Sequence, residues 1–256
     1  MTLLPDWPAP ARVRALCSTR AGGVSAPPWD SLNLGDHVGD RADHVAANRT
    51  RYAELLGARP VFLRQVHGSA VVRVASPTPD GDAADACVST GPGVACTIMV
   101  ADCLPVLLCD VEGRAVAAAH AGWRGLAGND GRGVLEATLD ALGACLGEAA
   151  PEIAPGLLAW LGPCIGPDAF EVGAEVRAAF TAHDPGATAL FRPHGERKWL
   201  ADLPALARRR LLALGVGGVY GNDGTASWCT VGNPSVFFSH RRDGTSGRFA
   251  ASIWLT

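Results

Sequence analysis

Several features that would place the protein in a membrane, outside the cell or on nucleic acid are missing from its 256 residues. No uninterrupted apolar run reaches the roughly 18 residues of a membrane-spanning helix. The N-terminus lacks the basic region and long apolar stretch of a signal peptide. Lys and Arg (22) do not outnumber Asp and Glu (25), so no basic excess points to nucleic acid or to a membrane surface. We therefore expect a cytoplasmic protein, and nothing in the sequence indicates an obligate protein partner.

The Cys-x-x-Cys spacing is absent as well, although the chain has eight cysteines. Without an export signal, these cysteines are expected to be reduced thiols, most of them buried as small apolar side chains. Charged residues make up 18% of the chain and hydrophobic residues 48%, which argues against disorder and predicts a substantial core. Because no linker-like segment divides the chain, we expect a single domain over residues 1–256.

The order of the apolar patterns predicts an α+β fold with mixed sheets. Alternation and short apolar runs predict strands over 11–19, 61–66, 71–74, 95–100, 104–109, 115–119, 157–161, 216–219, 235–239 and 249–255. Helical periodicity predicts helices over 40–56, 131–146, 172–180 and 203–214. The breaker-rich segment 20–37 and the polar, Gly-rich segment 80–93 are predicted to be loops. Strands and helices do not alternate regularly, and Glu112-Gly113 signals a hairpin, so α+β is favoured over a parallel α/β sheet.

Two histidines and one cysteine stand out because each lies where an apolar run meets turn residues. They are His67 in Arg-Gln-Val-His-Gly, Cys103 in Ala-Asp-Cys-Leu-Pro and His120 in His-Ala-Gly-Trp-Arg-Gly. Taken singly, each is more often an inert core residue than a functional one. Together they match the three protein ligands of an open catalytic zinc site, or a Cys nucleophile with a His base. Zinc is the metal expected, although copper also accepts imidazole and thiolate ligands.

Asp102 is adjacent to Cys103 in the sequence. Its carboxylate could orient one of the histidines from behind. A role in shaping the backbone turn before Cys103 is about equally favoured by the sequence.

The order of several short strings along the chain resembles one known family. The strings span 18–25 (STRAGGVS), 31–35 (SLNLG), 64–68 (RQVHG), 85–87 (DAC), 101–105 (ADCLP), 120–125 (HAGWRG), 162–166 (GPCIG), 170–173 (FEVG) and 239–248 (SHRRDGTSGR). Together they resemble the YfiH or laccase-domain family, whose members are variously called multicopper polyphenol oxidases, peptidoglycan editing factors and purine nucleoside phosphorylases.

The resemblance implies a layered α/β/β/α sandwich in which helices lie outside two mixed sheets. It also implies that His67, Cys103 and His120 bind the metal and are catalytic. The implied reaction is phosphorolysis of adenosine, inosine and S-methyl-5′-thioadenosine to the base and a ribose 1-phosphate, with an adenosine deaminase side activity. Purine nucleosides and inorganic phosphate would then be the substrates.

Phosphate binding calls for arginine, whose planar guanidinium presents a fork of donors. The candidates are Arg20, Arg64, Arg124, Arg241, Arg242 and Arg248. Arg20 and Arg124 are favoured because they border the loops that carry the site. Asn33 and Gln65 are predicted to bind sugar hydroxyls, the alternatives being an Asx-type turn for Asn33 and a strand-end hydrogen bond for Gln65.

Deamination in zinc enzymes of the cytidine and adenosine type usually involves a His-x-Glu motif, which this chain lacks. Glu171 and Asp85 are the substitutes that the sequence offers.

Two other activities stay open at this point. One is a Cys-dependent hydrolase that removes L-serine from a misassembled UDP-MurNAc precursor, with Cys103 as the thiolate and His67 or His120 as the base. The other is a copper-dependent polyphenol oxidase. The oxidase is less favoured, because multicopper oxidation needs many histidine ligands and the chain has seven, scattered along its length.

Overall fold

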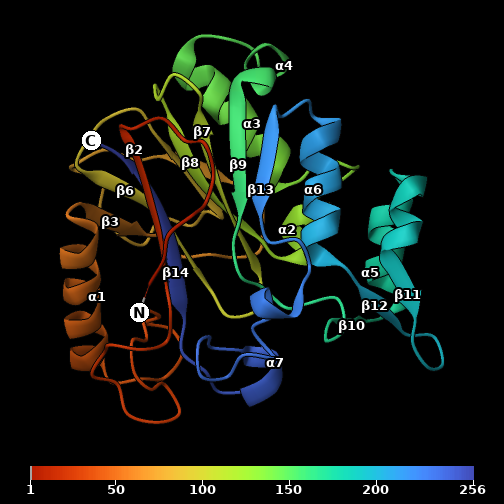
Figure 1. Ribbon diagram of the computed structural model, residues 1–256, viewed down its shortest axis with the longest axis horizontal. Coiled ribbons are helices and arrows are strands. Elements are labelled where there is room, and N and C mark those ends of the chain that lie inside the picture. The colour runs from red at the N-terminus through yellow and green to blue at the C-terminus, as the bar shows by residue number, and fades with distance from the viewer. Residues whose placement is uncertain (1) are drawn as a thin grey trace.

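Two β-sheets stack face to face at the centre of the computed structural model, which describes residues 2–256 (Figure 1). The first sheet has the spatial order β1 (Thr2–Leu3), β2 (Val13–Ser18), β14 (Phe249–Leu255), β6 (Val94–Val100) and β3 (Arg59–Phe62). The second has the order β13 (Gly218–Gly221), β9 (Leu157–Leu161), β7 (Leu104–Asp110), β8 (Val116–Ala121), β5 (Ala86–Ser89) and β4 (Val71–Arg73). A small third sheet contains β10 (Glu171–Val172), β12 (Trp199–Ala201) and β11 (Phe191–Pro193).

Both large sheets are mixed, as the sequence predicts. Antiparallel pairs form their centres, whereas β3–β6, β4–β5 and β13–β9 are parallel. Strands β7 and β8 form the expected hairpin around Glu112-Gly113, where Gly113 has a φ of 69° and donates its N–H to Asp110. Strands β6 and β7 are buried along their whole length because apolar layers cover both of their faces, which explains their continuous apolar sequences.

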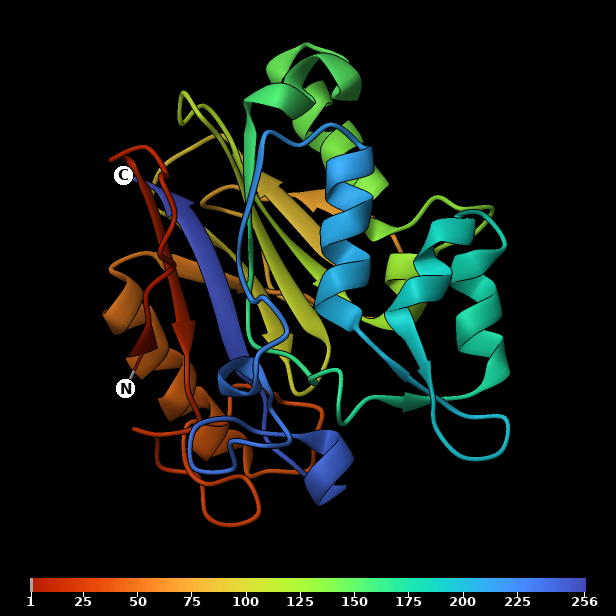
Figure 2. The same cartoon turned by 45° about the vertical axis from the view of Figure 1, so that its right-hand side comes forward.

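Helices cover the outer faces of both sheets (Figures 1 and 2). Helix α1 (Ala42–Leu56) packs on the first sheet, and Gly57 ends it in a left-handed conformation. Helices α3 (Val134–Leu146) and α6 (Leu203–Ala213) pack on the second sheet. Shorter helices are α2 (Trp123–Ala127), α4 (Ala150–Ile153), α5 (Ala174–Thr181) and α7 (His240–Asp243), with 3₁₀ turns at Ala154–Gly156, Pro185–Leu190 and Ala226–Trp228. The α/β/β/α layering implied by the family resemblance is therefore confirmed.

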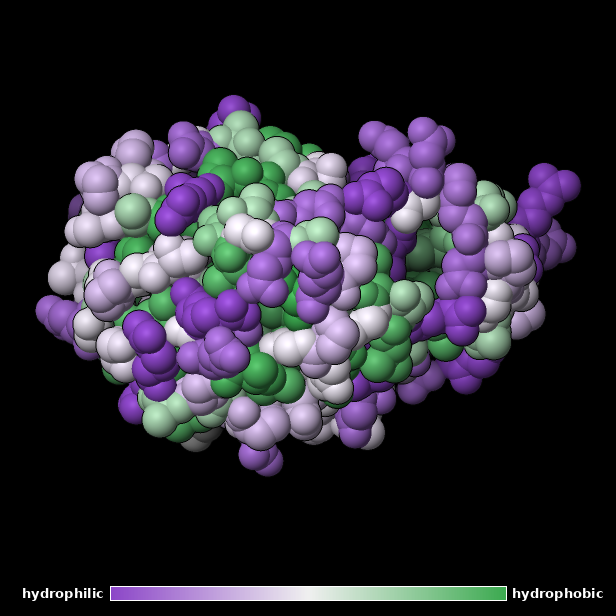
Figure 3. Space-filling model, turned by 90° about the horizontal axis from the view of Figure 1, so that it is seen from above, coloured by the Kyte–Doolittle hydropathy of each residue, from purple (hydrophilic) through white to green (hydrophobic). Residues whose placement is uncertain are grey.

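Among the helices that residues 2–256 form, none combines the length and apolar character needed to span a bilayer. Viewed from above, hydrophilic and hydrophobic residues are interspersed over the surface (Figure 3).

The prediction of a strand over 235–239 is wrong. These residues form a turn and an extended segment that lead into α7, and the Ser239 hydroxyl caps that helix by accepting the N–H of Arg242. Phe237 and Phe238 are buried between the sheets, so their apolar character serves the core without strand pairing. The strand expected over 61–66 is shorter than predicted, since β3 ends at Phe62.

The Gly-rich segment 80–93 is only partly a loop, because it contains the fully buried strand β5. Four residues are too few to show a period, and tertiary pairing with β8 fixes their conformation instead. Strand β4 pairs with β5 in the second sheet rather than with the strand that precedes it in the chain.

A buried ion pair ties the second sheet's helices to the loop after α2. Glu136 of α3 accepts hydrogen bonds from the N–H of Gly133 and from the guanidinium of Arg210 on α6. Arg210 also donates to the backbone carbonyls of Leu126, Ala127 and Gly131. The loop that follows the His-Ala-Gly-Trp-Arg-Gly motif is therefore held by one guanidinium.

We expect Glu136→Ala to lower the free energy of unfolding by about 3 kcal/mol, because it leaves the Arg210 charge buried without a partner. Urea unfolding measures this loss. The exposed pair between Glu148 and Arg114 provides the control, and Glu148→Ala should lower the free energy by less than about 1 kcal/mol. Equal losses in the two variants would contradict the role of the buried pair.

Candidate active site

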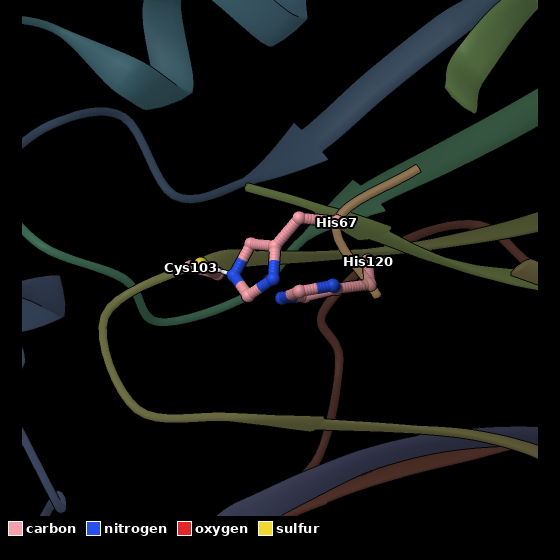
Figure 4. Close-up of side chains that lie close together, drawn as sticks. All are labelled: His67, Cys103 and His120. Atoms are coloured by element: carbon pink, nitrogen blue, oxygen red, sulfur yellow. Dashed lines mark hydrogen bonds between the residues drawn. The ribbon is translucent and has the colours of Figure 1, made fainter. Parts of the chain in front are cut away.

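The side chains of His67, Cys103 and His120 converge on one point, as the sequence predicts (Figure 4). One ligand atom from each lies within 4.8 Å of the other two. The Cys103 Sγ lies 3.7 Å from the His67 Nε2, and the two imidazole rings pack edge to face with centroids 4.8 Å apart. Segments distant in the sequence therefore build one cluster.

Each of the three residues is delivered by a different kind of local structure. His67 lies in the loop beyond β3 and has a positive φ of 59°, which is uncommon for a residue other than glycine. Cys103 directly precedes β7 in the tight connection from β6. His120 lies near the end of β8, as expected, one residue before its last residue Ala121, and is paired there with Pro105.

The carboxylate of Asp85 orients both histidines by binding the backbone of His67 and the ring nitrogen of His120 that faces away from the cluster. Its Oδ1 accepts the N–H of His67 at 2.9 Å and a hydrogen bond from the His120 Nδ1 at 2.8 Å. Its Oδ2 accepts the N–H groups of Val66 and Gly68 at 3.2 and 2.7 Å. Because a carboxylate only accepts, the His120 Nδ1 carries the proton, and its Nε2 is left for the cluster.

Asp85 is fully buried, and burial alone would raise its pKa. The hydrogen bonds from His120 and from the backbone outweigh burial and lower the pKa of Asp85 below its ordinary value. The charged form is therefore the stable one at neutral pH. This is the orienting role that the sequence offered to Asp102.

Asp102 has a different function in the structure. Its Oδ1 accepts from the Thr230 hydroxyl at 2.6 Å, and its Oδ2 accepts from the N–H of Arg241 at 2.7 Å. With a φ of 96°, Asp102 also makes the turn that presents Cys103. Of the two roles considered for this residue, the turn is the one observed.

Two glycines of the His-Ala-Gly-Trp-Arg-Gly motif allow the cluster to close. A Cβ on Gly122 would lie 2.9 Å from both the Cys103 Sγ and the His67 Cδ2. A Cβ on Gly125 would lie 2.6 Å from the carbonyl oxygen of Gly68. Any larger residue at either position would push the His67 loop away from Cys103.

The electrostatics of the cluster favour a thiolate. Burial alone would raise the pKa of Cys103, but His120 and His67 outweigh it and lower the pKa to about 6. Burial likewise opposes protonation of His120, whereas the Cys103 thiolate and Asp85 raise the pKa of His120 to about 9. In the metal-free protein, Cys103 and His120 therefore form an ion pair at neutral pH.

These three side chains could hold a metal ion. Thiolate and imidazole are borderline-soft donors that suit zinc, and copper accepts the same set. The His120 tautomer fixed by Asp85 turns a free nitrogen lone pair toward the other two ligands. The donor set and its arrangement thus fit a three-ligand site with an open fourth position.

The cluster lines a pocket of about 450 Å³. The other lining residues come from several loops and include aromatic, aliphatic and basic side chains: His37, Gln65, Met99, Val100, Ala101, Asp102, Trp123, Ile165, Phe170, Leu203, His240, Arg241 and Arg248. Of the arginines considered for phosphate, the pocket wall contains Arg241 and Arg248. Most of the apolar members carried no signal in the sequence, because buried apolar residues occur throughout the chain.

Gln65 lines the pocket, but its side-chain amide is already bonded. It donates to the carbonyl oxygen of Met99 at 2.8 Å and accepts the N–H of Met99 at 2.9 Å. This strand-end hydrogen bonding is the alternative that the sequence left open. Gln65 therefore shapes the wall, and sugar binding by its amide stays a prediction without support from the geometry.

Asn33 is fully buried and does not line the pocket. Its amide makes an Asx-type turn with Gly35 and bonds to Asp40 and to the N–H of Arg248. Its contribution to the pocket is thus made through Arg248.

Arg20 and Arg124, the arginines favoured from the sequence, both lie outside the residues that line the pocket. Arg20 donates to Asp30 and to the carbonyl oxygen of Pro234. Arg124 is exposed and stacks on Trp123, which does line the pocket. Proximity in the sequence to the site loops did not reveal which way these side chains point.

We expect Asp85→Asn to weaken zinc binding by about 10- to 100-fold, because an amide cannot accept all four N–H groups and no longer fixes the His120 tautomer. Competition against a chromogenic chelator measures the affinity. Asp110→Asn is the matched control, because Asp110 is a buried carboxylate of the same sheet that bonds Arg114 instead. Equal zinc affinity in the Asp85→Asn variant and the control would contradict the orienting role.

The pKa of Cys103 leads to a pH-dependent reactivity in the metal-free protein. Since the thiolate reacts, the rate of alkylation by iodoacetamide should rise through about pH 6 and level off above it. Labelling of Cys103→Ser provides the background from the other cysteines. A midpoint near the ordinary thiol value of about 8.5 would show that the histidines do not stabilise the thiolate.

Comparison with known proteins identifies relatives of this chain along nearly its whole length. The chain matches the family model described as multi-copper polyphenol oxidoreductase laccase over residues 14–256. A relative named purine nucleoside phosphorylase from Pseudomonas aeruginosa is 53% identical over 256 residues, which cover 99% of this chain and 98% of the relative. Another with that name, YfiH from Escherichia coli K12, is 51% identical over 255 residues with the same coverage.

Solved structures extend the likeness to the whole fold. The Neisseria meningitidis protein NMB0706 superposes with a TM-score of 0.89 at 49% identity, covering 99% of this chain and 98% of its own. YlmD from Geobacillus stearothermophilus superposes with a TM-score of 0.84 at 31% identity, covering 96% and 92%. With a family match over nearly its whole length and the three-ligand cluster in place, the chain belongs to the laccase-domain (YfiH) family.

Proposed function

We propose that the protein is a purine nucleoside phosphorylase that cleaves adenosine, inosine and S-methyl-5′-thioadenosine with inorganic phosphate, using a zinc site formed by His67, Cys103 and His120. The observation that carries the proposal is the convergence of these three side chains on the wall of a pocket of about 450 Å³. A pocket of that size is suited to a small-molecule ligand. The relatives named purine nucleoside phosphorylase, at 51–53% identity over almost the full chain, support the substrate class.

In this reaction, an oxygen of phosphate forms a bond to C1′ of the ribose while the bond from C1′ to the purine nitrogen breaks. The electron pair of that bond goes to the base, which takes up the proton that hydrogen phosphate loses, so that the atoms and charges balance. Zinc, when bound, would supply a positive charge that stabilises developing negative charge. Asp85 keeps both imidazoles oriented, and the apolar wall of Trp123, Ile165 and Phe170 offers surfaces for a purine.

Adenosine deamination is part of the proposal as a side activity. Neither carboxylate that the sequence offered for its proton transfer faces the pocket. The Asp85 carboxylate already accepts hydrogen bonds from four N–H groups. Glu171 is exposed and lies within ion-pair distance of Lys198 and His194. Asp102 is the carboxylate that lines the pocket, and we assign it the proton transfer if deamination occurs.

One observation favours a second candidate, the Cys-dependent hydrolase acting on peptidoglycan precursors. The Cys103 Sγ lies 3.7 Å from the His67 Nε2, and its pKa is lowered to about 6, as a nucleophilic thiolate requires. Such a hydrolase would turn over without phosphate and without metal.

The polyphenol oxidase activity named in the family description has less support. Within residues 2–256, His67, Cys103 and His120 are the one group of three potential ligands close enough to share a metal. Oxidation by several coppers needs further histidine ligands. Copper remains an alternative metal for this single site.

We also propose a cytoplasmic location for the protein, where nucleosides and phosphate are available.

The experiment that tests the proposal incubates the zinc-loaded protein with each nucleoside, with and without inorganic phosphate, and separates the products by chromatography. We expect free base and the ribose 1-phosphate to form only with phosphate. Cys103→Ala should lower the rate at least about 1,000-fold, because one of three metal ligands is lost. Cys145→Ala, at a half-buried thiol of α3 outside the pocket, should retain the wild-type rate.

The outcomes separate the candidates. Phosphate-independent release of L-serine from a UDP-MurNAc precursor by the metal-free protein would favour the hydrolase. Oxygen consumption with a phenol that scales with copper content would favour the oxidase. Normal cleavage of inosine by a folded Cys103→Ala variant would overturn the assignment of phosphorolysis to this site, and unchanged release of L-serine by that variant would overturn the hydrolase site.

A further inference from the structure

Arg248 is a half-buried cation on the pocket wall that makes no ion pair with a carboxylate of the described residues. It lies just before β14, and within residues 2–256 no carboxylate comes within the 4.0 Å of an ion pair. Its Nη1 donates to the carbonyl oxygens of Ser246 and Gly247 at 2.9 and 3.0 Å. The Nε and Nη2 groups make no hydrogen bond to the described part of the chain. A desolvated charge with free donors favours the arrival of an anion.

The backbone of Arg248 is clamped by the loop that follows β2. The Asn33 Oδ1 accepts the N–H of Arg248 at 2.8 Å, and the N–H of Leu34 donates to its carbonyl oxygen at 2.9 Å. The side chain then passes over Gly35, where an added Cβ would lie 2.7 Å from the Arg248 Cγ. The loop thus fixes both the start and the course of this side chain.

Among the other arginines considered for phosphate, Arg241 also lines the pocket, and its Nη1 likewise donates only to backbone carbonyls, those of Ala169 and Glu171. Arg241 is exposed to solvent and its guanidinium stacks on Phe170, whereas Arg248 is half-buried, so the charge of Arg248 is the less solvated of the two. Arg242 is bonded to Asp243 and to backbone carbonyls. The rest do not line the pocket: Arg20, Arg64 and Arg124.

The charge of Arg248 interacts with groups of the metal-binding cluster and with a second basic residue of the pocket, His37. Burial lowers the pKa of Arg248, while the negative charges of Cys103 and Asp102 act in the opposite direction. Burial and the Arg248 charge lower the pKa of His37, which lines the same pocket. Arg248 therefore lies within electrostatic reach of both Cys103 and His37.

We propose that Arg248, with His37 on the wall of the same pocket, forms the subsite that holds the inorganic phosphate of the reaction, and that Asn33 and Gly35 are positioning residues for Arg248. This inference rests on the proposed phosphorylase function. The free Nε and Nη2 donors match two oxygens of one phosphate in a forked arrangement. An anion bound there would share the pocket with the metal cluster, where the ribose must react.

The test compares Arg248→Gln and Arg248→Lys with the wild type, both in phosphorolysis and in direct titration of inorganic phosphate without nucleoside. We expect Arg248→Gln to raise the KM and Kd for phosphate at least about tenfold, while the KM for inosine changes less than about twofold. Arg248→Lys keeps the charge but loses the fork, so its increase should be smaller. Arg73→Gln is the control, because Arg73 is exposed on β4, outside the pocket, and should match the wild type.

Circular dichroism and the zinc content establish that each variant is folded and loaded. An unchanged phosphate KM and Kd in folded Arg248→Gln would overturn the subsite. So would a fall in kcat with unchanged phosphate binding, since Arg248 would then act only on Cys103. If the wild type binds phosphate through Arg248 but does not cleave nucleosides, the proposed function fails while the anion subsite stands.

Discussion

The buried carboxylate of Asp85 is the constraint on which the rest of the site depends. It accepts the N–H groups of three consecutive residues, 66–68, and the Nδ1 hydrogen of His120. Its own carbonyl oxygen accepts the N–H of His120, which continues the pairing of β5 with β8. One residue therefore sets the loop that carries His67 and the rotation of the His120 ring. A carboxylate removed from water is stable only when its acceptor positions are filled, so the loop and the ring are held together by the same requirement.

The close approach of Cys103 and the His67 loop to each other requires glycines, which have no side chain, at two neighbouring positions. Gly122 and Gly125 leave room for Cys103 and for the His67 loop, at separations where a methyl group would collide. The positive φ values of His67 and Asp102 are backbone conformations that cost free energy and persist because surrounding hydrogen bonds hold them. The fold itself thus brings the thiolate and the imidazoles together, and the charges of the histidines lower the pKa of Cys103.

The sequence pointed to the three-residue cluster, because His67, Cys103 and His120 lie where apolar runs meet turn residues and because the family resemblance implies them as metal ligands. It did not reveal the role of Asp85, since β5 is too short for a periodic pattern and lies in a Gly-rich segment. Phe237 and Phe238 suggested a strand because of their apolar character, yet three-dimensional packing buries them without pairing. The choice among arginines was beyond sequence reasoning as well. Side-chain direction and the presence or absence of a carboxylate partner depend on segments that meet only in the folded chain.

The irregular segment after β2 positions Arg248 although it contains no helix or strand. From α1, the buried Asn48 amide donates to the Ser25 hydroxyl and to the carbonyl oxygens of Ser31 and Asn33. Asn33 in turn binds the N–H of Arg248. A helix on the outer face of the first sheet is thereby connected through a loop to a cation in the pocket. Because an anion site gains most when its donors are fixed beforehand, this chain of amide hydrogen bonds gives a physical reason for a long loop with no strand or helix of its own.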